Sequence, residues 1–130
     1  MDYAESTRNN VGYDALVANS TLTSLDLRRN NFGLCCGAVV RLSKALAVNT
    51  ALTSLNLSSN EIGAGGVRRL SKALAVNTAL TSLNLSSNQI GADGAAWLGN
   101  ALAANSTLTS LDLSSNYIQG DEGVARLYVD

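Results

Sequence analysis

A perfect internal duplication constrains this chain more than any other feature of its sequence. The segment from Arg41 to Asn60, RLSKALAVNTALTSLNLSSN, recurs unchanged from Arg69 to Asn88, at an offset of 28 residues. Self-similarity at a fixed period is the signature of a repeat architecture. One such unit buries a few leucines at about 1.5–3 kcal/mol each. Ordering its backbone costs roughly 1–2 kcal/mol per residue, so the units must fold by stacking on one another.

A shorter leucine frame, L-x-x-L-x-L-x-x-N, occurs four times. Its second and third leucines alternate with small polar residues, a period of two that predicts a short strand with one buried face. The asparagine is predicted to end the strand and to satisfy loop backbone groups with its amide, and its recurrence suggests a stacked ladder. The frames are Leu22, Leu25, Leu27, Asn30; Leu52, Leu55, Leu57, Asn60; Leu80, Leu83, Leu85, Asn88; and Leu108, Leu111, Leu113, Asn116.

A helical stretch follows each strand, for example over residues 66–75. Val67, Leu70 and Leu74 have the i, i+3, i+7 spacing of one helix face, and the basic residues between them point away from it. Strands joined by such helices predict an α/β fold with a parallel sheet on the inner curve and the helices outside.

Glycine and asparagine are predicted to shape the turns of each repeat. Gly63 and Gly91 follow an Asn-x-Ile step and are expected to turn the chain where a Cβ would clash. Asn49, Asn77 and Asn105 end the helical stretches, where asparagine tolerates the left-handed position that follows a helix.

These repeats resemble the ribonuclease-inhibitor type of leucine-rich repeat over residues 22–127. The Asn-x-Ile-Gly-x-x-Gly step and the Ala-Leu-Ala helix end also resemble repeats of NOD-like receptors and of bacterial GALA effectors. The resemblance implies a solenoid of about four repeats of roughly 28 residues, with a short curved parallel sheet inside. It also implies protein binding along the concave sheet and its rim, in some members by covering an enzyme's active site.

The two ends of the chain depart from the repeat. Residues 1–21 are expected to form an N-terminal partial repeat or cap, and residues 22–130 the repeat domain. The chain ends in the middle of the fourth helix, a weak cap that a partner or a second copy would cover. Residues 34–37 and 119–123 enlarge two loops, which indicates either a binding rim or neutral drift.

Chemistry is poorly supported by the composition. The chain has no histidine, the usual general base, metal ligand and pH switch. Its two cysteines, Cys35 and Cys36, are adjacent and lack the spacing of a zinc or redox pair, so free thiols are expected. The plentiful serines have no histidine to activate them. We therefore expect no enzyme, no cofactor and no metal site.

Charge and hydropathy narrow the choice of partner. The net charge is −1, and no aromatic side chains accompany the arginines on the inner sheet, which argues against nucleic acid.

No apolar run is long enough to span a membrane, and the acidic N-terminus does not resemble a secretory signal. A cytoplasmic location is expected, with secretion into a host cell by another signal left open. Residues 20–77 carry seven Lys or Arg against two acids, which indicates either solvated surface or a polarised docking surface.

The strand register nominates a binding surface on the concave face and its rim. The middle of this face is a neutral field of Ser and Asn, against which Arg28, Arg29 and Tyr117 stand out, since interface hot spots favour Arg and Tyr. Trp97 lies on the outer helix face, where it would either contact a partner or pack on the neighbouring helix. The nominated residues are Asp26, Arg28, Arg29, Asn56, Ser58, Asn84, Ser86, Asp112, Ser114, Tyr117 and, on the convex side, Trp97.

The leading hypothesis from the sequence is therefore a module that binds and regulates a partner protein through its concave face, either by occluding an enzyme's active site or as a bacterial effector or effector regulator. The competing hypothesis is a structural fragment of a sensor-type protein, or a module that self-associates through its C-terminal end.

Overall fold

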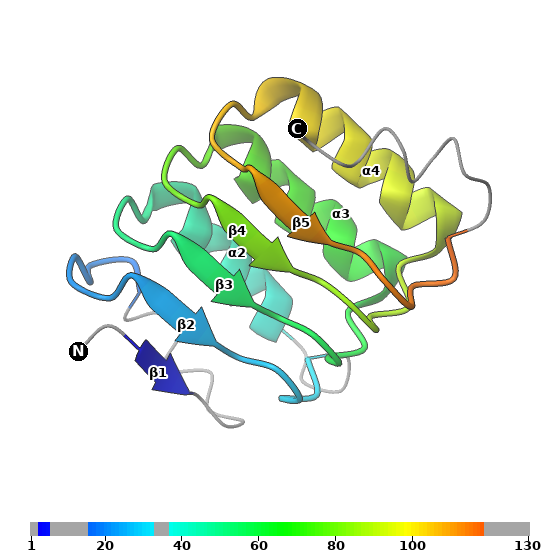
Figure 1. Cartoon of the computed structure of the whole chain (residues 1–130), viewed down its shortest axis with the longest axis horizontal. Helices are drawn as coiled ribbons and strands as arrows, with labels where there is room; N and C mark the ends of the chain where they lie inside the picture. Colours follow the sequence, from blue (N-terminus) through cyan, green and yellow to red (C-terminus); the bar gives the residue numbers. More distant parts are fainter. Residues whose placement is uncertain (1–2, 6–15, 33–36, 119–130) are drawn as a thin grey trace.

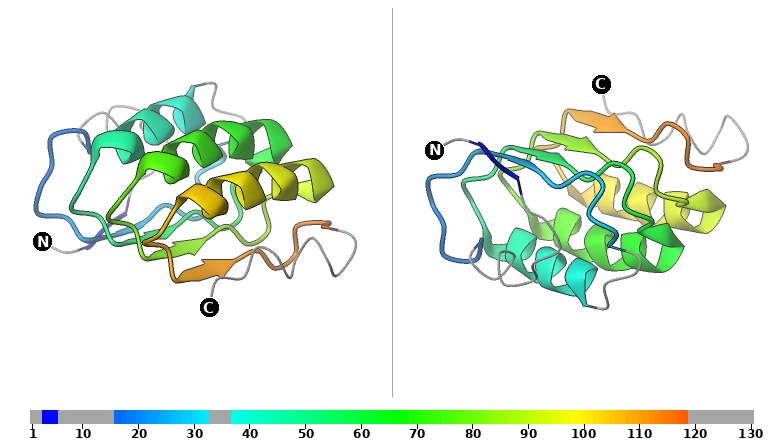
Figure 2. Two further views of the ribbon diagram at one scale, coloured as in Figure 1. Left: turned by 90° about the horizontal axis from the view of Figure 1, so that it is seen from above. Right: turned by 90° about the horizontal axis from the view of Figure 1, so that it is seen from below.

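The computed structural model describes residues 3–5, 16–32 and 37–118, the first of these as backbone only. Within them the strands form one parallel sheet in chain order, and each helix joins two neighbouring strands (Figure 1). The sheet forms one layer and the helices the other (Figure 2). The strands are β1 (Tyr3–Glu5), β2 (Ser24–Asp26), β3 (Ser54–Asn56), β4 (Ser82–Asn84) and β5 (Ser110–Asp112), and the helices are α2 (Ala38–Val48), α3 (Gly63–Val76) and α4 (Gly91–Ala104). The predicted α/β repeat solenoid is confirmed.

The leucine frame sets the register of the sheet. Leu25 pairs with Leu55, Leu55 with Leu83 and Leu83 with Leu111, so the same position of each repeat lies beside its counterpart. The strand leucines and the apolar helix face meet in one core. In α3 this face is the predicted one, Val67, Leu70 and Leu74, and all three are fully buried.

Strand β1 was not predicted from the sequence. It carries no leucine frame, and it extends the sheet by pairing in parallel with β2, Ala4 beside Leu25.

Further along, the carbonyls of Leu16 and Asn19 accept hydrogen bonds from Asn49 Nδ2 at 2.7 and 3.1 Å. Asn77 Nδ2 donates in the same way to the repeat before it. The division of the chain at residue 21 stays a prediction.

The predicted asparagine ladder is present and buried. Asn88 has no exposed surface. Its Oδ1 accepts hydrogen bonds from the backbone N–H groups of Asn60, at 2.9 Å, and Ile62, at 3.2 Å. Its Nδ2 donates to the carbonyls of Leu57, at 2.9 Å, and Leu85, at 3.0 Å. One amide thereby joins two repeats.

The same bond links every repeat to the next. The backbone N–H of Asn30 donates to Asn60 Oδ1 at 2.6 Å, and that of Asn88 donates to Asn116 Oδ1 at 2.7 Å. Because the loop groups it serves are shut off from water, each amide replaces hydrogen bonds that solvent cannot supply.

The asparagines that end the helices are not left-handed, so that prediction was wrong. Asn49, Asn77 and Asn105 have φ of −73°, −71° and −94° and extended backbones. The physical reason is a second set of side-chain bonds. In Asn77, Oδ1 accepts from the N–H of Leu80 at 2.7 Å, and Nδ2 donates to the carbonyl of Leu46 at 2.7 Å. The amide thus satisfies a carbonyl that the end of the preceding helix leaves unpaired.

Left-handed backbone occurs instead on both sides of each ladder asparagine. Ser59 (φ 58°) and Glu61 (φ 55°) flank Asn60, and the other repeats repeat the pattern. Such a conformation costs a residue other than glycine roughly 1–2 kcal/mol. Gly63 is also left-handed (φ 72°), and no atom lies within 4 Å of the place a Cβ would take, so backbone conformation rather than the predicted clash requires glycine there.

Removing one rung of the ladder should destabilise the whole domain. Asn88→Ala leaves the buried N–H groups of Asn60 and Ile62 without a partner, at about 1–3 kcal/mol for each unsatisfied group. The carbonyls of Leu57 and Leu85 each lose one donor but keep the amides of Asn60 and Asn116. We expect a loss of roughly 3–5 kcal/mol in the free energy of unfolding, measured by urea denaturation. Asn84→Ala is the matched control, because Asn84 accepts only the N–H of Ser86 at 2.9 Å and should cost about 1 kcal/mol. Equal losses in the two variants would contradict the assigned role.

Two adjacent serines allow a test of the left-handed backbone. Ser58 and Ser59 are both half-buried, but only Ser59 has a positive φ. Ser59→Gly relieves that conformation and should leave stability unchanged or raise it by about 0.5–1 kcal/mol. Ser58→Gly gains nothing to offset the greater entropy of the unfolded chain and should lower stability by about 0.5–1 kcal/mol. The account fails if the two variants shift the urea midpoint in the opposite order.

Candidate protein-binding surface

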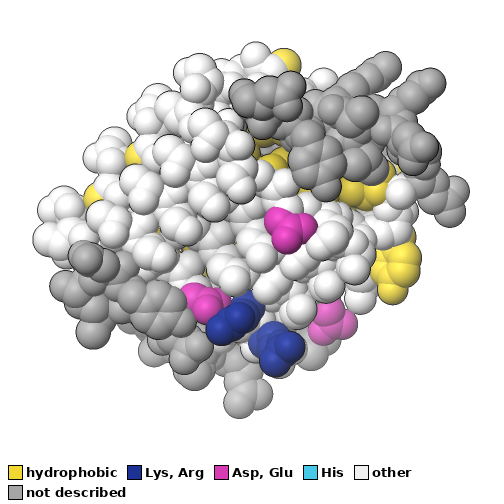
Figure 3. All heavy atoms as spheres, viewed as in Figure 1, with side chains coloured by type: hydrophobic (Ala, Val, Ile, Leu, Met, Phe, Trp, Pro, Cys, Tyr) yellow, Lys and Arg dark blue, Asp and Glu magenta, His cyan; other side chains and the backbone are white. Residues whose placement is uncertain are grey.

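The sheet turns one face toward the helices and the other toward solvent. We call the second the open sheet face: the polar residues that alternate with the buried leucines of β2–β5, together with the residue two positions after each strand. Its polar side chains are half-buried in β3 and β4 and exposed in β5. Figure 3 views the molecule from this side and shows a largely neutral surface with few charged side chains. The predicted neutral field is therefore present.

Three of the nominated binding residues also shape the ends of their strands. The Oδ1 atoms of Asn56, Asn84 and Asp112 accept the backbone N–H two residues further on, at 3.0, 2.9 and 3.0 Å. The donors are the backbone N–H groups of the nominated serines, Ser58, Ser86 and Ser114 in turn. The Nδ2 groups of Asn56 and Asn84 take part in none of the hydrogen bonds found among the described residues, and they remain available to a partner.

Asp26 differs from its counterparts because it is buried, with 8% of its surface exposed. Arg28 Nε forms an ion pair with Asp26 Oδ2 at 3.1 Å, and the N–H of Arg28 donates to Oδ1 at 3.1 Å. The backbone of Glu5 in β1 also pairs beside Asp26. The side chain of Arg28 is 55% exposed. Of this pair, the arginine is the group placed to contact a partner, and Asp26 orients it.

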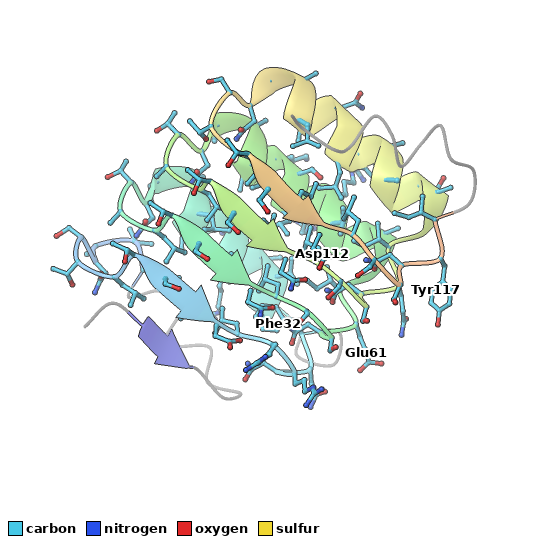
Figure 4. All side chains as sticks on the ribbon, in the orientation of Figure 1. Phe32, Glu61, Asp112 and Tyr117 are labelled. Carbon is cyan, nitrogen blue, oxygen red and sulfur yellow. The ribbon has the colours of Figure 1, made fainter. Side chains whose placement is uncertain are left out.

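A column of exposed side chains forms the rim, where the strands lead into the loops. It consists of Asn31, Glu61, Gln89 and Tyr117, each left-handed, and Figure 4 shows Glu61 and Tyr117 along this edge. Tyr117 is 78% exposed at φ 59°. A bulky aromatic side chain in this conformation is uncommon. In the part of the chain that the structure describes, it is the aromatic member of this column.

The size of the open sheet face limits the interface that it can make. With strands about 4.8 Å apart, the four strands β2–β5 together cover a width of about 19 Å, and six residues along a strand span about 20 Å. The face therefore has a projected area of roughly 400 Å², about half of the ~800 Å² that each partner contributes to a standard interface. A partner of ordinary affinity must extend onto the rim, where Arg29 and Tyr117 lie at opposite ends.

Trp97 on α4 is partly covered by the neighbouring helix. The guanidinium carbon of Arg68, on α3, lies 4.9 Å from the centre of the Trp97 ring, and 39% of Trp97 stays exposed. This distance is that of a cation–π contact. Of the two alternatives for Trp97, packing on the neighbouring helix is observed, and a contact with a partner stays a prediction.

Neither a metal cluster nor a membrane-spanning helix occurs in the described residues. They contain no group of three or more His, Cys, Asp or Glu side chains placed to hold a metal ion. None of the helices found in them has the length and apolar character needed to cross a membrane. The adjacent cysteines, the enlarged loop at 34–36 and the one at 119–123 lie outside the described residues.

Four segments of the chain, residues 18–34, 48–71, 76–98 and 104–127, match the family described as Leucine Rich repeat. This chain belongs to the leucine-rich-repeat family. The matched segments follow the repeats seen in the sheet, since each contains one strand and the ladder asparagine that comes after it. Domains of this family are protein-interaction modules.

Solved structures of other proteins share the fold. An actin-binding site 2 of leiomodin-1 matches with a TM-score of 0.78 and 22% identity, over 98% of this chain and 78% of that one. The C-terminal domain of a Caenorhabditis elegans tropomodulin matches with a TM-score of 0.60 and 14% identity, over 92% and 89%. At these identities the likeness shows the fold alone. The search of curated proteins found no significant match.

Tyr117 should prove dispensable for folding. Tyr117→Asn removes a side chain that buries little surface and places there a residue that tolerates the left-handed region. We expect the free energy of unfolding to stay unchanged or to rise by about 0.5 kcal/mol, measured by urea denaturation. The buried Phe32, 3% exposed, is the control, and Phe32→Ala should cost about 3–5 kcal/mol. A loss above about 1 kcal/mol in Tyr117→Asn would show that the tyrosine is structural.

Proposed function

We propose that this chain binds a partner protein through the open sheet face and its rim, with Arg28, Arg29 and Tyr117 as the main contacts. The observation that carries the proposal is Tyr117, an aromatic side chain that is 78% exposed on a left-handed backbone. All four rim positions share the left-handed backbone, but a bulky aromatic side chain is uncommon in it, and the exposure of Tyr117 leaves its ring accessible to a partner. Tyrosine is also among the residues that dominate binding energy at interfaces.

The neutral middle of the face supports the same proposal. Between the arginines and Tyr117 lie half-buried serines and asparagines, whose amide and hydroxyl groups can donate or accept hydrogen bonds. Covering these uncharged groups avoids the cost of burying an unpaired charge, and Asp112 in β5 is the charged exception on this face. The arginines and the tyrosine then provide strong contacts at the two ends.

The effect on the partner is proposed to be regulation by steric occlusion. The described sheet face presents no constellation of acid and base groups, so its means of acting on a bound protein is to cover part of it. The resemblance to ribonuclease-inhibitor-type repeats implies this mode, with an enzyme as the partner. We place this role in the cytoplasm, or in a host cell for a secreted effector.

Actin is the first named partner to test. One of the similar structures is an actin-binding site of leiomodin-1, and its fold covers nearly the whole of this chain. Whether the same surface is used is not implied by the fold, so actin enters the experiment as one purified partner beside a whole extract.

A quantitative pull-down tests the proposed surface. The immobilised wild-type chain is compared with the variant Arg28→Glu, Arg29→Glu, Tyr117→Ala, using purified actin and an extract of the source cells. We expect a partner that the variant binds at least about 30-fold more weakly, the loss of roughly 2 kcal/mol expected of a hot spot. Circular dichroism and urea denaturation confirm beforehand that both proteins fold.

The matched control substitutes the same kinds of residue, two arginines and one aromatic residue, on the helices. It carries Arg41→Glu, Arg68→Glu and Trp97→Ala, and it should bind as well as the wild type. If this variant loses the partner and the first one retains it, binding takes place on the helical side. If the partner binds all three equally, neither set of residues contributes and the proposal is wrong.

Self-association is a second candidate, favoured by the position of β5. Among the described residues this strand is the last of the sheet, and its Ser110 and Asp112 are exposed where the counterparts in β4 are half-buried. An unpaired edge is a ready template for another chain, although a charged residue on it opposes pairing. Light scattering over a range of concentrations measures the mass: a value that stays at 13.5 kDa excludes this function, and a rise to the dimer supports it.

A further inference from the structure

A furrow lies between α2 and α3 on the side of the molecule opposite the open sheet face. It encloses about 240 Å³. Val40, Ala47 and Ala73 form an apolar floor, and the basic side chains of Lys44, Arg69 and Lys72 surround it. A second hollow of about 450 Å³ adjoins it, since Arg69 and Lys72 line both, and Gly65 and Arg68 complete it. Nothing in the proposed function uses this surface.

The furrow also contains a buried polar group without a partner. Ser43 lines it and is 7% exposed, and its Oγ makes no hydrogen bond. A buried hydroxyl in this state is destabilising, and native proteins seldom leave one so. The Oγ atom is itself closed to solvent, and its repeat counterpart Ser71 is in the same state, so a ligand would meet the shape and charge of the furrow and not this hydroxyl.

The electrostatics of the two helices are one-sided. The sequences of α2 and α3 contain five Lys or Arg residues and no acid. The side chains of Lys44, Arg69 and Lys72 are all exposed. A concave site surrounded by cations attracts anionic groups and raises their local concentration. The charge complementarity therefore calls for an acidic ligand.

The repeat provides an internal comparison, because the neighbouring furrow between α3 and α4 has counterparts at an offset of 28 residues. Val40 corresponds to Arg68 there, and Arg69 corresponds to Trp97. Arg68 stacks on Trp97 at 4.9 Å, so the chain's own side chains lie over the position that stays open between α2 and α3. The open furrow is the variant of the repeat that leaves room for a ligand.

We propose that the furrow between α2 and α3 binds a short acidic segment of a protein partner. One apolar side chain of the segment sits on the floor formed by Val40, Ala47 and Ala73. The flanking Asp or Glu carboxylates bind Lys44, Arg69 and Lys72. The cavity is smaller than the roughly 300–1,000 Å³ of small-molecule sites, which fits one side chain better than a whole cofactor. An apolar floor does not complement the polar sugar-phosphate backbone of a nucleic acid.

An NMR titration of the ¹⁵N-labelled full chain tests this proposal. The probe is a peptide in which one leucine has three glutamates on each side, and the control peptide has glutamines in their place. We expect amide shifts concentrated in α2 and α3 with the acidic peptide. We also expect binding at least tenfold weaker for the glutamine peptide.

Three variants locate the site. Lys44→Glu with Lys72→Glu reverses the charge, and Val40→Arg with Arg69→Trp copies the covering pair of the next furrow. Each should weaken binding of the acidic peptide at least tenfold. The matched control, Arg28→Glu with Arg29→Glu, reverses two charges on the open sheet face and should leave binding unchanged. That control also separates this proposal from the proposed function, which depends on the arginines it removes.

Other outcomes overturn the proposal. It fails if the acidic and the glutamine peptide bind equally, if the acidic peptide does not bind, or if only the open-face variant loses binding. Vesicles containing phosphatidylserine form the final arm. If the vesicles change the amide signals of α2 and α3 while the acidic peptide does not, the surface binds anionic membranes instead of a protein.

Discussion

The fold depends on one buried interaction, the hydrogen bonding of the ladder asparagines. A loop that is shut off from solvent must have its backbone groups paired, and the leucines cannot pair them. Asn88 takes N–H groups of the preceding repeat on its oxygen and gives its NH₂ group to carbonyls of both repeats. Because each rung requires the next repeat, the same bonds that satisfy the loops also hold the stack in register. A second row, typified by Asn77, does this at the ends of the helices.

This arrangement leaves two surfaces on which the sequence can vary. The ladder asparagines and the leucines occupy the buried positions. The residues beside them on the open sheet face and on the outer helix face do not pack in the core, so they can vary. The two middle repeats keep these surfaces nearly the same, as their duplication requires. Both proposed binding surfaces lie where the repeats differ: Arg28 and Tyr117 at the two ends of the sheet, and Val40 and Arg69 where the next furrow has Arg68 and Trp97. A solenoid of this kind offers two independent faces to partners.

Much of the fold follows from the sequence because its signals are local and periodic. The leucine frame gave the strands and the core, and the spacing of Val67, Leu70 and Leu74 gave the buried helix face. What it could not give depends on contacts between repeats. Strand β1 has no periodic signal and forms by pairing with β2, and the extended backbone of Asn77 follows from a bond to Leu46 in the repeat before it. The burial of Asp26 and the stacking of Arg68 on Trp97 likewise depend on contacts between residues whose spacing forms no motif. The sequence therefore nominated positions for the candidate site, but it did not predict which of their side chains are exposed.

The central claim, that buried amides turn these loops into a rigid support for the binding faces, is tested most directly by native-state hydrogen exchange. The backbone N–H groups of Asn60 and Ile62 donate to the fully buried Asn88 Oδ1, and the exposed Glu61 lies between them. The account predicts that Asn60 and Ile62 exchange only through global unfolding, with the free energy measured by urea, while Glu61 exchanges much faster. If Asn60 and Ile62 exchange as quickly as Glu61, the ladder opens locally and does not hold the repeats together.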